Sequence, residues 1–263
     1  MFSSIFTKTL YEKRWSLLGW AIGLLAMTIM TMIFYPNFKH AEFEAMFKSM
    51  PESLKPLVGS AESFKTIPGY IAQQVYGPQI PIFLIVMGIM LFIGIGIGDE
   101  DRGTLQTLLV QPVSRPKVYW QKALAGATLI MLATLAIAVG VLVSLIFIHE
   151  TYSLSRLIAV TLSTFLMVMA FGSVAFGIGL GLGKKSLAIS ISSGYAFFCL
   201  IITSLAPAVE KLRPTEKLSI FYYFNNPNFA VAEVNWTHVL VLAGFSAAFL
   251  IGGSILFRQR DLQ

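Results

Sequence analysis

The side chains most able to take part in binding or catalysis lie in a polar run between two long apolar segments. The run begins with three consecutive carboxylates, Asp99, Glu100 and Asp101. Three neighbouring carboxylates could bind a divalent cation, stabilise the positively polarised start of a short helix, or face a basic surface of a partner. Helix-start electrostatics or partner docking is the simpler explanation, and we predict that the acids open a short helix.

An amphipathic pattern follows the three acids. Leu105, Leu108 and Leu109 fall at positions i, i+3 and i+4, so a helix here would have one apolar face. Pro112 would end that helix, and Ser114 could cap the next one. A short amphipathic helix between two spans can lie flat at a membrane surface and present itself to a soluble partner. The alternative is an ordinary solvated loop.

The remaining polar motifs do not predict a catalytic, nucleotide or metal site. Residues 177–186 resemble a phosphate-binding loop, but that motif needs Ser or Thr directly after Gly-Lys, and Lys185 follows Lys184. We therefore predict no nucleotide site and no cofactor bound by this chain. The three histidines lie near the predicted outer boundary, without a second metal ligand at helical spacing: His40, His149 and His238.

The apolar segments also lack an evident reactive group. Cys199 is the single cysteine and has no His or acid near it in the sequence, which argues against an intramembrane enzyme. The methionines suit gap filling between helices, and no Met ladder leads to a histidine cluster that would indicate a copper path. No charged residue is expected at mid-membrane, which argues against an ion-driven carrier. The path suits an apolar or amphipathic substrate that is driven from outside the chain.

Composition and long apolar runs predict an all-α membrane protein. The chain has 263 residues, of which 56% are hydrophobic and only 12% charged, with a mean hydropathy of +0.74. A soluble domain carries about 25% charged residues. Six segments meet the length of about 20 apolar residues that a bilayer requires. These six spans are predicted at residues 15–35, 78–98, 120–148, 157–182, 187–206 and 237–257.

The segments between the spans have distinct characters. Residues 1–14 carry an apolar face and predict an interfacial helix; a cleaved signal peptide is the rival interpretation. Residues 99–118 form a loop on the side of the termini. Residues 36–77 predict short helices on the outer surface, either as a lid over an exit path or as a packing cap. Residues 207–236 are rich in aromatic and amide side chains, which suit the bilayer interface.

The distribution of charge predicts the orientation. The side of the termini holds 11 basic and 5 acidic residues, a net charge of +6, whereas the other side holds 8 of each. Basic residues accumulate on the cytoplasmic side of membrane proteins. We therefore predict a multi-pass protein of the inner or plasma membrane with both termini in the cytoplasm, and we predict no nucleic-acid partner.

The order of residue types in the polar run resembles a motif of a known family. Acid-x-x-Arg-Gly-Thr-Leu-x-x-Leu-Leu-x-x-Pro-Val-Ser-Arg, residues 99–115, is similar to the loop after the second span in permease subunits of ABC-2, or type V, exporters. The resemblance implies six spans, a cytoplasmic coupling helix that docks on a separate ABC ATPase, and a second permease subunit. ATP and Mg would be used by the ATPase partner. The ATPase-coupling residues would be Asp99, Glu100, Asp101, Arg102, Gly103, Thr104, Leu105, Leu108, Leu109, Pro112, Ser114 and Arg115.

The same resemblance places the substrate path. In ABC-2 exporters the first, second and fifth spans line the central interface, and short re-entrant helices precede the last span. Small residues on these spans permit close helix packing or a narrow path, and both interpretations remain open here. The path residues would be Gly19, Gly23, Gly94, Gly98, Ser190, Ser193, Gly194 and Phe197.

These observations predict the permease subunit of an ATP-driven exporter for a drug, an antibiotic or a lipid-like molecule. The alternative is a membrane scaffold or sensor that does not transport.

Overall fold

The computed structural model describes residues 4–39, 64–77, 79–101, 103, 113–206, 209–225 and 229–260. Within these ranges the chain forms helices and no strand. The α-helices are α1 (Ile5–Ile33), α5 (Ile67–Tyr70), α6 (Gln79–Ile95), α7 (Ile97–Asp101), α9 (Arg115–Phe147), α10 (Leu154–Leu182), α11 (Lys185–Leu205), α12 (Ile220–Asn225) and α13 (Trp236–Gln259). A π-helix occupies Ile71–Val75, and 3-10 helices occupy Tyr35–Lys39 and Glu210–Leu218.

Five helices are long and apolar enough to cross a membrane: α1, α9, α10, α11 and α13. A sixth span results if Ile67–Val75 and α6 are counted together as one span. The two pieces meet at a bend of 42°. The sequence predicted short helices on the outer surface for residues 36–77. Within that region residues 67–75 are helical, and their side chains Ile67, Tyr70 and Ile71 are buried.

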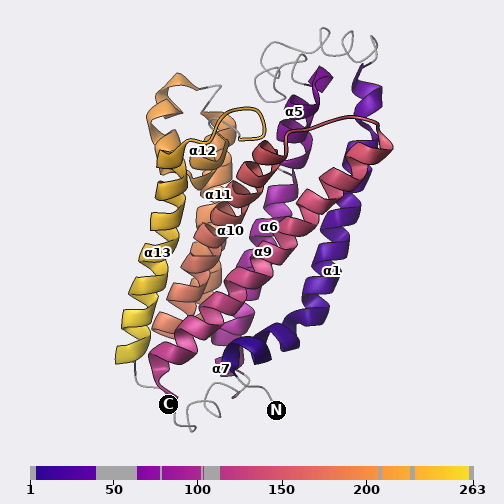
Figure 1. The fold of residues 1–263 in the computed structure, drawn as a ribbon. Coiled ribbons are helices and arrows are strands. Elements are labelled where there is room, and N and C mark those ends of the chain that lie inside the picture. The colour runs from indigo at the N-terminus through magenta and orange to yellow at the C-terminus, as the bar shows by residue number, and fades with distance from the viewer. Residues whose placement is uncertain are drawn as a thin grey trace.

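The helices form one bundle in which α6 holds a central position (Figure 1). α1 packs along α9, and α10 packs along α13. α6 lies against α9 and α10 and is flanked by α1 on one side and α11 on the other. Both chain ends lie at the end of the bundle that carries α7, while α5 and α12 lie at the opposite end (Figure 1).

The N-terminal helix joins the two elements that the sequence predicted. An interfacial helix was expected at residues 1–14 and a span at 15–35, and α1 runs through both regions from Ile5 to Ile33. Ser4 caps it by accepting a hydrogen bond from the Thr7 N–H at 3.2 Å. The Ile5 N–H donates to the Gln121 side chain at 3.0 Å, which ties the start of α1 to α9. The first turns of α1 lie across the end of the bundle before the helix rises (Figure 1).

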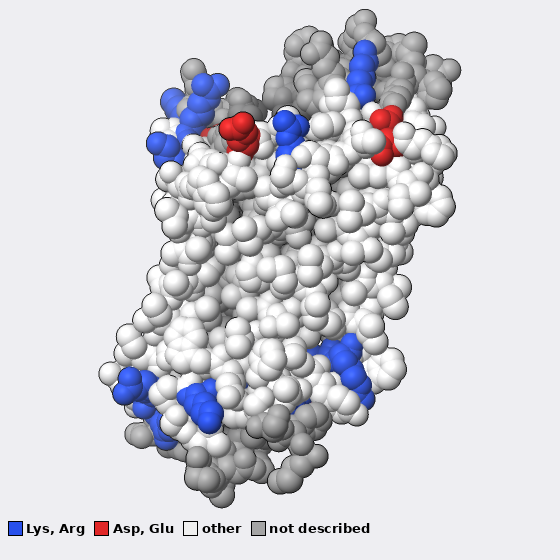
Figure 2. Space-filling model, in the orientation of Figure 1, with Lys and Arg blue, Asp and Glu red and all other residues white. Residues whose placement is uncertain are grey.

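Charged side chains are confined to the two ends of the bundle. On the face drawn in Figure 2, a broad middle zone shows neither basic nor acidic atoms. The end that carries α5 and α12 shows both signs of charge, whereas the opposite end shows only Lys and Arg among its described residues (Figure 2). This distribution is typical of a protein whose middle zone contacts lipid.

Glycines allow the closest helix contacts. A Cβ atom added at Gly172 or at Gly126 would lie 2.4 or 2.5 Å from the ring of Phe92 on α6. Between α10 and α13, a Cβ at Gly253 would lie 2.4 Å from the Gly177 Cα. All three distances are shorter than real contacts of a methyl group. The contact at Gly253 involves backbone of α10, which cannot rotate away. Close packing therefore accounts for Gly172 and Gly177.

We expect Gly253→Ala to destabilise the fold by about 1–3 kcal/mol, because the added methyl would push α13 away from α10. Gly244→Ala on the same helix is the matched control, since nothing lies within 4 Å of its added Cβ. That control should be neutral or slightly stabilising, because Ala favours a helix over Gly. Thermal unfolding of the purified protein measures both variants, and equal melting temperatures would contradict the packing described here.

Candidate functional site

The site begins where α6 breaks. The Asp99 N–H donates to the Gly96 carbonyl at 3.2 Å instead of continuing the helical pattern to the Ile95 carbonyl. The Lys122 ammonium, from α9, donates to the Ile95 carbonyl at 2.7 Å. A carbonyl without a partner in a membrane interior costs several kcal/mol, so Lys122 makes this break tolerable.

Lys122 also pairs with the Asp99 carboxylate, and its side chain is fully buried. Lys122 is one of the 11 basic residues counted on the side of the termini, but its side chain is not exposed there. The reason is that its ammonium reaches two acceptors on the neighbouring α6–α7 connection. A buried charge is tolerated when it is paired and hydrogen-bonded, and here both conditions hold.

The second acid, Glu100, pairs with Arg260 just beyond α13. Both guanidinium Nη atoms donate to the Glu100 carboxylate, an arrangement that favours Arg over Lys. Arg260 also donates to the Leu180 carbonyl at 3.2 Å, near the end of α10. Gly183 follows α10 with φ +67°, and a Cβ there would lie 2.0 Å from the Arg260 guanidinium carbon. Gly183 therefore both ends α10 and leaves room for Arg260.

The third acid, Asp101, pairs with Lys185 at the start of α11. The ammonium and the carboxylate are 2.8 Å apart, and both side chains are about half exposed, at 48% and 47%. Exposed pairs of this kind contribute about 0–1 kcal/mol. The three acids thus pair with basic residues on three different helices, and the pair with α11 is the most exposed of the three.

The three acids lie on the short helix α7. Asp99 and Glu100 are in its first turn, where the positive end of a helix favours carboxylates, and α7 ends at Asp101, with Gly103 at a left-handed φ of +71°. The sequence predicted that the acids open a helix carrying Leu105, Leu108 and Leu109, and those three residues lie outside the described part of the chain. Lys122, Arg260 and Lys185 offset the mutual repulsion of the three neighbouring carboxylates.

The other predicted coupling residues are only partly placed. Ser114 occupies the N-cap position of α9, although its side chain makes no capping hydrogen bond. Arg115 donates to the Arg260 carbonyl and so joins the same cluster. The following residues lie outside the described part of the chain: Arg102, Thr104, Leu105, Leu108, Leu109 and Pro112.

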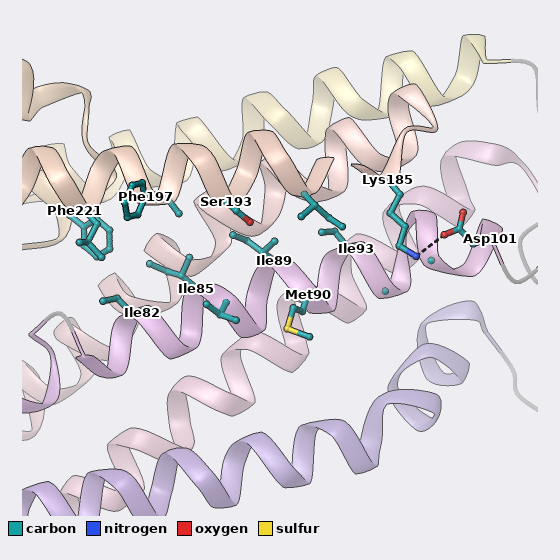
Figure 3. A pocket seen from close by; sticks show the side chains of 16 residues that line it. Ile82, Ile85, Ile89, Met90, Ile93, Asp101, Lys185, Ser193, Phe197 and Phe221 are labelled. Atoms are coloured by element: carbon teal, nitrogen blue, oxygen red, sulfur yellow. Dashed lines mark hydrogen bonds and ion pairs between the residues drawn. The ribbon is translucent and has the colours of Figure 1, made fainter. Parts of the chain in front are cut away.

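A groove of about 570 Å³ runs between α6 and α11 and ends at the Asp101–Lys185 pair (Figure 3). Its walls are almost entirely apolar, with isoleucines of α6 facing Phe197 of α11 (Figure 3). Four of the eight residues predicted for a substrate path line it: Gly94, Gly98, Ser193 and Phe197. The structure therefore brings together half of that predicted set, from α6, α7 and α11.

The other four predicted path residues lie outside the groove. Gly19, Gly23 and Gly194 have nothing within 4 Å of an added Cβ, and Ser190 is exposed. Among the described residues, therefore, no close helix packing occurs at the three glycines. With respect to this part of the chain, their faces on α1 and α11 are open.

Sequence reasoning missed the partners of the acids and most of the groove wall. The pairs join residues 23, 84 and 160 positions apart in the chain, and no local pattern signals such distances. α6 is apolar on all sides, so its sequence does not show which face is open. A signal existed for Lys122, since a lysine inside a predicted span requires a partner.

Among the described residues, no group of three His, Cys, Asp or Glu side chains is placed to hold a metal ion. Asp99, Glu100 and Asp101 each face a basic group, so their oxygens are engaged by protein cations.

An apolar helical bundle with several helices long enough to cross a bilayer is typical of a multi-pass membrane protein. The family model described as ABC-2 family transporter protein matches residues 3–262, so the chain belongs to the ABC-2 transporter family. Members are membrane-transport components that generally lack a catalytic site of their own, and membership implies association with an ABC ATPase. No curated protein shows significant similarity to the chain.

We expect the three ion pairs to differ in stability. Lys122→Ala should cost about 3–5 kcal/mol, because it removes one partner of a buried ion pair. Lys185→Ala, which removes a half-exposed partner, should cost about 0–1 kcal/mol. Thermal unfolding in detergent measures both variants. The double variant Lys122→Met with Asp99→Leu should recover part of the loss, and equal losses for the two single variants would contradict this account.

Proposed function

We propose that this chain is the permease subunit of an ATP-driven exporter whose ATPase is a separate protein. Family membership supports a transport role. The observation that carries the ATPase partnership is the position of the acidic triplet, Asp99 to Asp101. It anchors the start of the segment 102–112 to α9, α11 and α13 at once. A force applied to that segment by a partner would therefore reach three spans directly.

The orientation follows from the same end of the bundle. The anchored segment must lie in the cytoplasm if an ATPase binds it, and this is the end where both chain termini lie (Figure 1). The described charges at that end are basic on the face shown in Figure 2, as the positive-inside rule requires. We accordingly infer cytoplasmic termini and a location in the inner or plasma membrane.

We further propose that a second permease subunit covers the free faces of α1 and α11. Gly19, Gly23 and Gly194 leave room for another helix to approach, and small residues are what permit close helix contacts in lipid. The groove between α6 and α11 would then open toward the subunit interface. Its apolar walls suit an apolar or amphipathic cargo such as a drug, an antibiotic or a lipid-like molecule.

Leu108→Asp tests the ATPase partnership. If Leu108 lies in the contact, its loss should weaken assembly by about 1.5–3 kcal/mol, the value of one buried leucine side chain. Co-purification of the permease with its ATPase over a range of concentrations measures the effect. Leu218→Asp, an exposed position at the opposite end of the bundle, is the control and should assemble normally. Unchanged assembly of both variants would favour a scaffold or sensor without an ATPase.

Gly194→Trp tests the path. The indole would fill the free face of α11 beside Ser193 and Phe197, so export should fall to background while the ATPase still binds. Because nothing lies within 4 Å of an added Cβ at Gly194, the isolated subunit should fold and express normally. Substrate efflux from vesicles, with ATPase binding as the parallel readout, measures the outcome. A fully active Gly194→Trp variant would exclude this face from the path.

A further inference from the structure

The groove between α6 and α11 has one charged end, and a third charged group, in the neighbouring cavity, lies close to it. Besides Asp101 and Lys185, the ammonium of Lys13 on α1 lies 3.3 Å from the point where a Cβ on Gly94 would stand, and Gly94 lines the groove. Met90 borders both this groove and the smaller cavity that contains Lys13. Lys13 and Lys185 therefore approach the same end of the groove from α1 and from α11.

The charges at this end do not balance. Lys185 is paired with Asp101 at 2.8 Å. Glu12, the nearest acid along α1, is 3.7 Å from Lys8. Within the described part of the chain, the Lys13 ammonium has no hydrogen-bond or ion-pair partner. Two lysines and one aspartate leave one excess positive charge beside an apolar groove, which is complementary to an anion that carries an apolar body.

The rest of the groove fits a slender apolar body. Along α6 its wall extends from Ile82 to Gly94, and at about 1.5 Å per residue this corresponds to roughly 18 Å. The volume of about 570 Å³ lies within the range of about 300–1,000 Å³ that is usual for small-molecule sites. Ser193 supplies a hydroxyl among the apolar side chains of the wall. The long axis therefore runs from an apolar end at Phe221 to the charged end at Lys185.

We propose that the groove binds a single-chain amphiphile with an anionic head group, taken from the membrane leaflet on the side of α7. The tail lies along α6, and the head accepts hydrogen bonds from Lys185 and Lys13. Lys185 gives up Asp101 at this step, which is inexpensive because that pair is exposed. A cationic head would meet two ammonium groups and is disfavoured by like charge. The amphiphile would be the substrate class of the exporter proposed above. Its transport rests on that proposed function, whereas its binding needs no ATPase.

The test is binding of two matched probes to the purified full chain in nanodiscs of zwitterionic lipid. One probe is a palmitate analogue with a photoreactive diazirine, and the other is the trimethylammonium of the same chain length. We expect the carboxylate to bind better and to label residues of α6 and α11. Lys13→Gln with Lys185→Gln should weaken carboxylate binding by about tenfold or more, without weakening the cationic probe.

Asp101→Asn gives an effect of opposite sign. It frees Lys185, so carboxylate binding should strengthen severalfold while cation binding weakens. Lys184→Gln is the control, because Lys184 is exposed and adjacent in sequence but does not line the groove, and it should change neither affinity. These substitutions remove only exposed or partly exposed groups, so folding is checked by thermal unfolding alongside each measurement.

Four outcomes would overturn the proposal. Equal binding of the two probes would show a groove that accepts any tail. Labelling outside α6 and α11 would indicate annular lipid. Displacement of the probe by anionic phospholipid alone would assign the site to a two-chain lipid. If neither probe binds and Ser193→Cys crosslinks two chains, the groove is covered by a second copy of this chain. ATPase co-purification is a separate measurement, so its failure would reject the transport role and leave selective binding intact.

Discussion

Three consecutive carboxylates on one five-residue helix are the constraint on which the rest of this structure depends. Asp99, Glu100 and Asp101 are neighbours in α7, and like charges at this spacing repel one another. Each carboxylate pairs with a cation, and the cations come from α9, from α11 and from Arg260 just beyond α13. These pairs link the ends of three spans to the α6–α7 connection, and the pair with α11 lies at the end of the groove.

The three ion pairs are graded in burial, and the gradation has a mechanical consequence. Lys122 and Asp99 form a buried pair, and Lys122 also donates to the Ile95 carbonyl, so Lys122 joins α9 firmly to the end of α6. Arg260 binds Glu100 with two Nη atoms and also contacts α10. Lys185 and Asp101 are half exposed and exchange easily with water or with another anion. A displacement of α7 would therefore separate α11 first, and α11 is the helix that forms one wall of the groove.

How much of this the sequence predicts depends on the range of each interaction. Apolar length alone predicts the helices now seen as α9, α10, α11 and α13 within a few residues, because lipid imposes a minimum length on any span. The break after Ile95 was not predicted, since its stability depends on Lys122, which arrives from another helix. The path residues on α11 illustrate the same limit. Spacing put Ser190, Ser193, Gly194 and Phe197 on one face, but only the packed bundle shows that Ser193 and Phe197 line a groove shared with α6.

The free faces of α1 and α11 show why composition, and not exposure, is the informative property in a membrane. Large exposed side chains such as Trp15, Ile22 and Phe197 would indicate a missing partner in water, but lipid satisfies them equally well. Association between helices in lipid needs close backbone approach, which only small residues allow. Gly19, Gly23 and Gly194 provide it on helices that flank α6 on both sides. A second subunit packed on those residues would close the groove from the side and leave its charged end accessible. An amphiphile could then enter from the leaflet with its tail first, so that its head group stays at the charged end.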